Sequence, residues 1–170
     1  MIQQLTTNRL NLVPLSLMHL SEEYVSWMND KAVIKHLESG GNYTLELLKE
    51  YLKEQEKKQI LFWAIHLKSN NKHIGNIKID PIVSKSGEYG IMIGDKNTWG
   101  KGYAKEASIA VINYCFEQLH LKQITLGVLK ENKAALKLYE KVGFFNYKTI
   151  EEVKNSKKRT IIRMKITNGK

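Results

Sequence analysis

Two glycines one residue apart, Gly100 and Gly102, stand in the stretch WGKGYAKEA, where an extended segment gives way to a helical one. The first backbone N–H groups of a helix have no partner within the helix, and glycine lets a ligand approach the backbone because it has no Cβ atom. Lys101 and Lys105 are unfavourable beside the positive end of the helix dipole unless they face an anion. The bend therefore predicts a diphosphate site, although a plain tight turn also explains the two glycines.

Other phosphate-binding motifs fit this stretch less well. The chain contains no G-x-x-x-x-G-K-[ST] run, which excludes a P-loop. A dinucleotide fingerprint needs a third glycine where this chain has Lys105. The pattern favours a small binding site on a mixed sheet.

A second candidate region follows in VLKENKAALKLYEKVGF. Asn132 lies at the end of a predicted strand, where its amide can bond an extended ligand. Tyr139 lies seven residues further on, on the inner face of the next predicted helix. A tyrosine hydroxyl that points into a cleft can donate a proton, whereas an isolated core tyrosine usually satisfies its hydroxyl locally. The nearby glycine bend favours the catalytic interpretation of Tyr139.

Hydrophobic periodicity predicts alternating runs of strands and helices along the chain. The predicted strands cover 9–15, 61–67, 73–80, 88–94, 122–129, about 145–153 and about 160–166. One helix is predicted to start at Ser21, and three further helices are predicted over 44–58, about 104–119 and 132–144. Ser69-Asn70-Asn71-Lys72 is typical of a hairpin turn. This order indicates an α+β fold with a mixed sheet, and the 170 residues fit one domain over 1–170.

Composition narrows the class of protein. The chain has one cysteine, Cys115, which excludes an intramolecular disulfide, and its five histidines show no ligand spacing, so no metal is expected. The chain contains no signal-like N-terminus and no run of roughly 18 apolar residues, so we expect a cytoplasmic protein without a membrane partner. The net charge of +10 suits an anionic ligand or serves solubility alone.

Taken together, these motifs resemble the GNAT superfamily of acetyl-CoA-dependent N-acetyltransferases, and in particular its ribosomal-protein-alanine acetyltransferase branch. The resemblance covers nearly the whole chain, through TTNRLNLVPL, the hairpin FWAI…IGNIKI, WGKGYAKEA and NKAALKLYEKVGF. It implies one twisted, mostly antiparallel sheet of about seven strands with about four helices. It also implies that the sheet splays between the fourth and fifth strands, 88–94 and 122–129.

The resemblance assigns the cofactor, acetyl-CoA, to particular residues. The superfamily signature Q/R-x-x-G-x-G/A maps onto Trp99, Gly100, Lys101, Gly102, Tyr103 and Ala104, with Trp99 departing from the usual Gln or Arg. The strand at Met92 and Ile93 is expected to pair with the pantetheine like an additional strand. Further contacts are expected at Asn132, Lys133 and Ala135, and Tyr139 is expected near the sulfur.

The implied reaction is direct acetyl transfer to a primary amine, with Tyr139 as the proton donor to the leaving thiolate. A backbone N–H near Ile93 is the expected partner of the oxyanion. Glu88 is the expected general base, because the branch often has an acidic residue two positions before the strand glycine, here Gly90. A water chain or a merely solvated Glu88 remains the alternative.

The acceptor side is less determined by the sequence. Trp27 and Asp30 lie on one face of an N-terminal helix and are expected to line the acceptor cleft, unless Trp27 is simply packed and Asp30 ends the helix. We expect the acceptor to be a protein N-terminus, a small amine or an amino sugar on a nucleotide.

Two other functions stay open: a silent coenzyme A sensor, and a basic nucleic-acid-binding domain that would use KNSKKR. No recognised nucleic-acid-binding motif supports the second of these. Edge strands near the C-terminus could join two copies into a homodimer.

Overall fold

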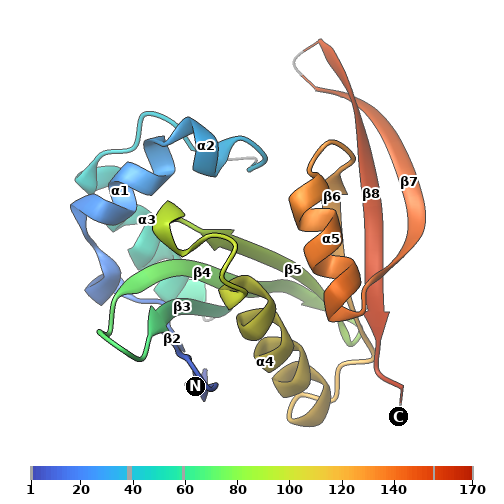
Figure 1. Ribbon diagram of the computed structural model, residues 1–170, viewed down its shortest axis with the longest axis horizontal. Helices are drawn as coiled ribbons and strands as arrows, with labels where there is room; N and C mark the ends of the chain where they lie inside the picture. The colour runs from blue at the N-terminus through green and yellow to red at the C-terminus, as the bar shows by residue number, and fades with distance from the viewer. Residues whose placement is uncertain (1, 38–39, 59, 155, 170) are drawn as a thin grey trace.

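The computed structural model describes residues 2–37, 40–58, 60–154 and 156–169. These residues form one eight-stranded sheet in the order β1-β2-β3-β4-β5-β6-β8-β7, together with five α-helices and two 3₁₀ helices (Figure 1). The strands are β1 (Leu5–Thr6), β2 (Leu10–Pro14), β3 (Leu61–Leu67), β4 (His73–Val83), β5 (Ser86–Ile93), β6 (Gln123–Leu129), β7 (Phe145–Lys154) and β8 (Lys157–Thr167). The helices are η1 (Leu17–His19), α1 (Glu22–Asn29), α2 (Lys31–Ile34), α3 (Leu45–Lys58), η2 (Lys96–Thr98), α4 (Tyr103–Glu117) and α5 (Lys133–Val142).

The α+β class and the order of the long elements confirm the sequence prediction. Helix ends follow the predicted capping residues: the Ser21 hydroxyl accepts from the Tyr24 N–H at 3.1 Å at the start of α1, and Gly143 ends α5 with a φ of +111°. The count of about seven strands omitted the two-residue β1, and the count of about four helices omitted the four-residue α2. Segments this short show no hydrophobic period. Asn155, within the predicted basic turn, lies outside the described residues.

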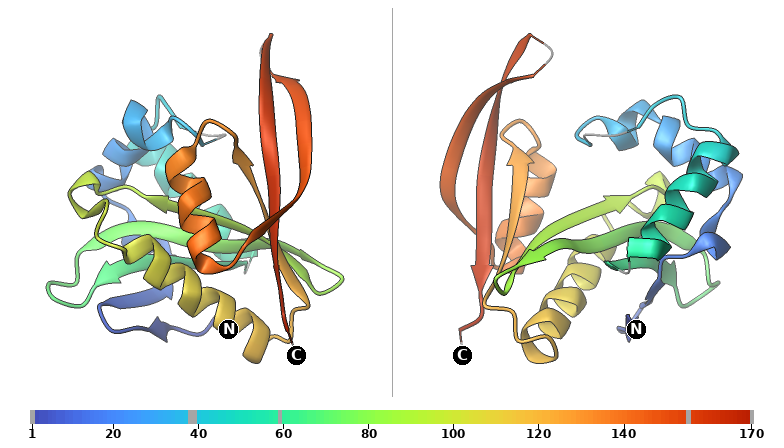
Figure 2. Two further views of the ribbon diagram at one scale, coloured as in Figure 1. Left: turned by 45° about the vertical axis from the view of Figure 1, so that its right-hand side comes forward. Right: turned by 180° about the vertical axis from the view of Figure 1, so that it is seen from behind.

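The central feature of the sheet is the junction of β5 and β6. Neighbouring strands are antiparallel except at this junction, where Ser86–Glu88 pair in parallel with Gln123–Thr125. β5 continues to Ile93 and β6 to Leu129, but the register ends at Glu88 and Thr125. Figure 2 shows the two strands meeting at one end and separating toward the other. The predicted splay between the strands 88–94 and 122–129 is confirmed.

Helices cover both faces of the β1–β5 half of the sheet. α4 lies on one face and α3 with α1 on the other, as the opposite views in Figures 1 and 2 show. The α4 side shares its core with α5, where the hydroxyls of Tyr89 on β5 and Ser108 on α4 are 2.6 Å apart. The α3 side buries Leu48 and Leu52 completely. Of the helices described, none has the length and hydropathy needed to cross a membrane.

β7 is the strand at the C-terminal edge of the sheet. Its side chains are mostly exposed, including Phe145, Tyr147 and Val153. An exposed edge strand can pair with another chain. Pairing between two copies through β7 stays a prediction.

Three of the five histidines, which are scattered in the sequence, meet between η1, β3 and β4. The ring centroids of His19, His66 and His73 lie 5.2–5.3 Å apart, and the His73 ring lies 4.9 Å from that of Trp27. Burial lowers the pKa of His73 to about 4, despite its hydrogen bonds to Asn76 and the Gly75 carbonyl. The cluster therefore holds a neutral, packed His73 at neutral pH.

This packing predicts that the protein loses stability in mild acid. Between pH 6.5 and about 4 the unfolded chain binds a proton at His73 and the folded chain does not, so the free energy of unfolding falls by up to about 1.4 kcal/mol per pH unit as the pH decreases. Urea unfolding across this range is expected to show a shallower pH slope for His73→Phe than for the wild type. His120→Asn, at an exposed position with a φ of +53° that asparagine tolerates, is the matched control and should keep the wild-type slope. An unchanged slope in His73→Phe would contradict this account.

Candidate active site

The bend before α4 exposes a row of backbone N–H groups. Gly100 and Gly102 have φ values of +74° and +83°, in the left-handed region that favours glycine. Gly102 is the N-cap of α4 and gives it no side-chain cap. No described residue accepts a hydrogen bond from the N–H groups of 100–105, and the first N–H of the helix to pair is that of Glu106, with the Gly102 carbonyl at 3.1 Å. A Cβ atom added to Gly100 would meet nothing within 4 Å, so the space beside this glycine is open.

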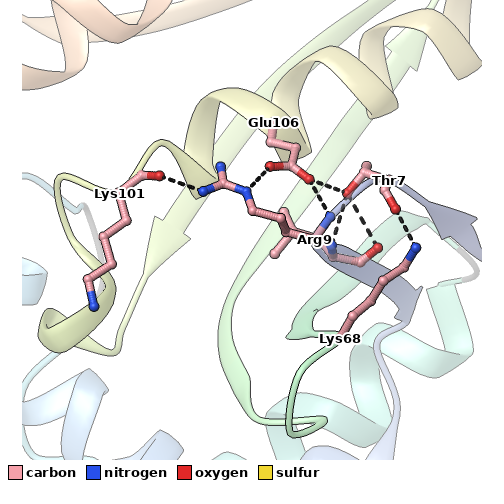
Figure 3. Close-up of polar contacts among 6 residues, drawn as sticks. Thr7, Arg9, Lys68, Lys101 and Glu106 are labelled. Carbon is pink, nitrogen blue, oxygen red and sulfur yellow. Dashed lines mark hydrogen bonds and ion pairs between the residues drawn. The ribbon is translucent and has the colours of Figure 1, made fainter.

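Arg9 fixes the shape of this bend from outside (Figure 3). Its Nη1 donates to the Lys101 carbonyl at 3.0 Å, and its Nε donates to Glu106 Oε2 at 2.7 Å. The guanidinium also lies 4.5 Å from the centroid of the Tyr103 ring. The Arg9 side chain, directly before β2, thus holds the middle of the bend and the first turn of α4 together.

Glu106 is the acidic partner in this arrangement. Its Oε1 accepts from the Thr7 hydroxyl at 2.6 Å and from the Arg9 backbone N–H at 2.8 Å. Burial raises the pKa of Glu106, but the hydrogen bonds from Thr7 and Arg9 outweigh it and hold the pKa below its ordinary value. A charged carboxylate in the first turn of a helix is favourable, because it offsets the positive end of the dipole.

The end of β5 offers a second set of backbone groups. Met92 and Ile93 pair on one side with Asn76 and Gly75 of β4, while β6 no longer accompanies β5 on the other side. The indole Nε1 of Trp99 donates to the Ile93 carbonyl at 2.9 Å. The tryptophan that departs from the family signature therefore links the glycine bend to the end of β5.

Tyr139 lies on α5, the helix that follows β6, which is one of the two strands that separate. Its ring packs edge-on against Tyr89 of β5, with the centroids 5.6 Å apart, and the residue is 9% exposed. Since Tyr89 follows the last paired residue of β5, this contact places Tyr139 where the two strands begin to separate. Burial raises the pKa of Tyr139 to about 12, so the hydroxyl stays protonated at neutral pH and can act as a donor.

The other predicted contacts on α5 belong to its first turn. Asn132 is the N-cap, and its Oδ1 accepts from the Ala135 N–H at 3.2 Å. Its side-chain oxygen thus serves the helix, which leaves the amide NH₂ as the group that can donate to a ligand. Lys133, exposed, and Ala135, half-buried, flank this cap.

Glu88 is held in a more rigid setting than a general base needs. Its two carboxylate oxygens accept from Arg163 Nη1 and Nη2 at 2.6 and 2.7 Å, and Oε2 also accepts from the Thr125 hydroxyl at 2.6 Å. Burial raises the pKa of Glu88, but these bonds outweigh it and lower the pKa below its ordinary value. A lower pKa makes Glu88 a weaker proton acceptor. Its predicted role as a base stays a prediction that this geometry disfavours.

The two predicted acceptor residues are engaged within the protein. Trp27 is 5% exposed, and its ring lies so close to Gly94 that an added Cβ would approach it to 2.0 Å. Asp30 caps α2 by accepting from the Ala32 N–H at 2.8 Å and forms an ion pair with Lys96. This agrees with the alternative of a packed tryptophan and a helix-ending aspartate. Direct contact of either residue with an acceptor stays a prediction.

Arg9, Glu106 and Arg163 are site residues that the sequence analysis did not identify. Glu106 carried a local signal, because an acidic residue in the first turn of a helix compensates its dipole. Arg9 and Arg163 carried none, since their partners lie 97 and 75 residues away in the chain.

Solved structures share this fold. The structure of an acetyltransferase (GNAT family) from Bacillus anthracis matches 97% of this chain and 98% of its own, with a TM-score of 0.87 and 19% sequence identity. A spermidine N-acetyltransferase from Vibrio cholerae, solved with CoA and spermine, matches 95% of this chain and 96% of its own, with a TM-score of 0.82 and 22% identity. At these identities the likeness concerns the fold.

The sequence itself settles the family. The model of the Acetyltransferase (GNAT) domain matches residues 9–145, and the chain belongs to this family.

Two sequence relatives are named N-acetyltransferases. An SPbeta prophage-derived uncharacterized N-acetyltransferase of Bacillus subtilis (strain 168) is 30% identical over 99 residues, which cover 57% of this chain and 55% of that protein. An uncharacterized N-acetyltransferase of Bacillus licheniformis is 32% identical over 101 residues, which cover 58% and 56%. The chain thus matches little more than half the length of these relatives.

The bend makes a testable prediction about coenzyme A binding. Gly102→Ala should strain the left-handed backbone by roughly 1–2 kcal/mol and displace the N–H donors, which would weaken the binding of coenzyme A about tenfold or more. Isothermal titration calorimetry with coenzyme A measures this change. Gly41→Ala is the matched control, because Gly41 has nearly the same φ of +84° and only Ile34 near its added Cβ, at 4.0 Å. Equal affinities in Gly102→Ala and the wild type would refute a role for this bend.

Proposed function

We propose that the protein is an N-acetyltransferase that transfers an acetyl group from acetyl-CoA directly to a primary amine in a ternary complex. The observation that carries the proposal is the row of N–H groups at 100–105 without a described acceptor, placed beside a sheet that opens at β5 and β6. Backbone donors at a helix N-terminus bind phosphate oxygens. Membership in the GNAT family and relatives named N-acetyltransferases support the activity.

The proposed cofactor fits the residues that surround the opening. The open space in front of Gly100 admits a pyrophosphate, and the exposed Lys101 and Lys105 add positive charge beside it. The free side of β5 near Met92 and Ile93 suits an extended pantetheine with amide groups. The Asn132 amide, just beyond the end of β6, is the proposed further donor to that arm.

The proposed reaction consists of one addition step and one elimination step. The neutral amine attacks the thioester carbonyl, a C–N bond forms, and a backbone N–H near Ile93 stabilises the oxyanion. The C–S bond then breaks, and the thiolate takes the proton of the Tyr139 hydroxyl. The amine proton passes to Glu88 or to water, and the Tyr139 phenolate recovers its proton from solvent. An α-amine, with a pKa of roughly 7.7–8.0, is partly neutral at pH 7 and needs less help than a lysine amine near 10.4.

The acceptor is proposed as a primary amine on a protein N-terminus, a small molecule or an amino sugar. Two structural neighbours carry names of this kind: the spermidine N-acetyltransferase from Vibrio cholerae and a ribosomal-protein-S5-alanine acetyltransferase from Vibrio fischeri. The predicted cytoplasmic location belongs to the same proposal. Cys115 is buried and free, and burial raises its pKa to about 12, which argues against a covalent acetyl-enzyme.

Tyr139→Phe tests the proposed proton donor. Removing the hydroxyl should lower kcat about 100-fold, in the range of general acid catalysis, because the thiolate would leave without its proton. The affinity for coenzyme A should change little, since the ring and its contact with Tyr89 remain. Release of free thiol from acetyl-CoA with a panel of primary amines measures turnover.

Tyr114→Phe is the matched control, because Tyr114 lies on α4 and packs edge-on against Trp63 of β3. Unchanged turnover in Tyr139→Phe would remove Tyr139 from the mechanism. Tight binding of coenzyme A by the wild type without thiol release for any amine would favour a coenzyme A sensor over an enzyme.

A further inference from the structure

An ion pair lies at the point where the sheet opens. Glu88 of β5 and Thr125 of β6 form the last pair of the parallel register, and beyond them the strands separate. Arg163, the partner of Glu88, belongs to β8, on the far side of β6. The Arg163 side chain therefore extends across β6 to reach Glu88 on β5.

The ion pair between Arg163 and Glu88 is bidentate, and each partner has a further hydrogen bond. Arg163 Nη1 and Nη2 donate to separate oxygens of Glu88 at 2.6 and 2.7 Å. The Thr125 hydroxyl donates to Glu88 at 2.6 Å, and Arg163 Nε donates to the Tyr147 hydroxyl at 3.4 Å. The two charged side chains are 23% and 32% exposed, so they are largely screened from water. A bidentate pair of this kind fixes direction as well as distance.

A glycine makes the crossing possible. Arg163 is paired in register with Gly127 of β6, and a Cβ atom at Gly127 would approach Arg163 Nη1 to 3.0 Å. Glycine in the middle of a strand weakens it, and it often marks a place where another group passes closely. Because Gly127 has no side chain, the guanidinium of Arg163 can pass over it and reach Glu88.

The bridge joins the two halves of the proposed site. The first half carries the glycine bend and the end of β5, and the second carries α5 with Tyr139. Only three residue pairs link β5 to β6 directly. A fixed link at the last of these pairs sets the angle at which the strands diverge.

We propose that Arg163 is a positioning residue for acetyl transfer, which by bridging β8 to Glu88 holds Tyr139 at its working distance from the free side of β5. This inference rests on the proposed acetyltransferase function. It gives Glu88 a positioning role, whereas the sequence analysis gave it the role of general base. The two roles predict different kinetics.

Substitutions at both ends of the bridge distinguish the two roles. If the pair acts as one unit, Arg163→Met and Glu88→Gln each lower kcat about tenfold, because a small misplacement of reacting groups is costly. The double variant then loses no more than either single variant. The acidic limb of the pH–kcat profile stays in place in Glu88→Gln. Arg163→Lys, which keeps the charge without the two-pronged geometry, should recover part of the loss.

Arg159→Met is the matched control. Arg159 also lies on β8 and forms a cross-strand ion pair, with Glu152 of β7, but away from the splay. It should keep kcat and the KM for acetyl-CoA within about twofold of the wild type. Circular dichroism and thermal unfolding establish that each variant is folded before its kinetics are compared.

Gly127→Ala gives a test that leaves both charges in place. The added methyl group would lie 3.0 Å from Arg163 Nη1, so the guanidinium must shift by a few tenths of an ångström, and kcat should fall by less than in Arg163→Met. If Arg163→Met does not fold, Glu88→Gln and Arg163→Lys carry the test.

Wild-type kcat in folded Arg163→Met would overturn the inference, as would wild-type kcat in both Glu88→Gln and Arg163→Lys. Loss of the acidic limb in Glu88→Gln alone, with Arg163→Met near the wild type, would overturn it in favour of a base. Failure of the wild type to turn over acetyl-CoA with any amine would overturn the proposed function instead.

Discussion

The structure depends on a sheet that stops pairing in its middle. β5 and β6 share three residue pairs and then separate, although both strands continue. Separated strands leave backbone donors and acceptors that the sheet cannot satisfy, and such groups require water or a ligand. The N-terminus of α4 adds further unpaired donors beside this opening. One interruption of the hydrogen-bond ladder thus creates both the space and the polar groups of the proposed site.

Side chains from distant parts of the chain keep this interruption in shape. Arg9, directly before β2, pairs with Glu106 of α4 and holds the glycine bend, and Trp99 ties the bend to the Ile93 carbonyl. Arg163 and Glu88 hold the other end, where the strands part. A site whose donors are fixed before the ligand arrives does not spend binding energy on ordering them. The ion pairs therefore belong to the functional description as much as the glycines do.

Much of the fold was visible in the sequence because its signals are local. The glycine bend, the caps at Ser21, Asn132 and Gly143, and the alternation in the strands all arise from neighbouring residues. The splay was expected only through the resemblance to a family, since no local pattern states where two strands separate. Arg9, Arg163 and the cluster of histidines were not predicted, because their partners are distant in sequence and are brought together only by the sheet order. Trp27 and Glu88 were predicted by position, and the structure shows how fully the protein itself engages them.

The most direct test of the account is a crystal structure of the protein with coenzyme A. The pyrophosphate oxygens are expected within hydrogen-bond distance of the N–H groups of residues 100–105, with the pantetheine beside Met92 and Ile93 in the opening between β5 and β6. A coenzyme A molecule whose phosphates bind elsewhere, with those N–H groups still facing water, would contradict the account.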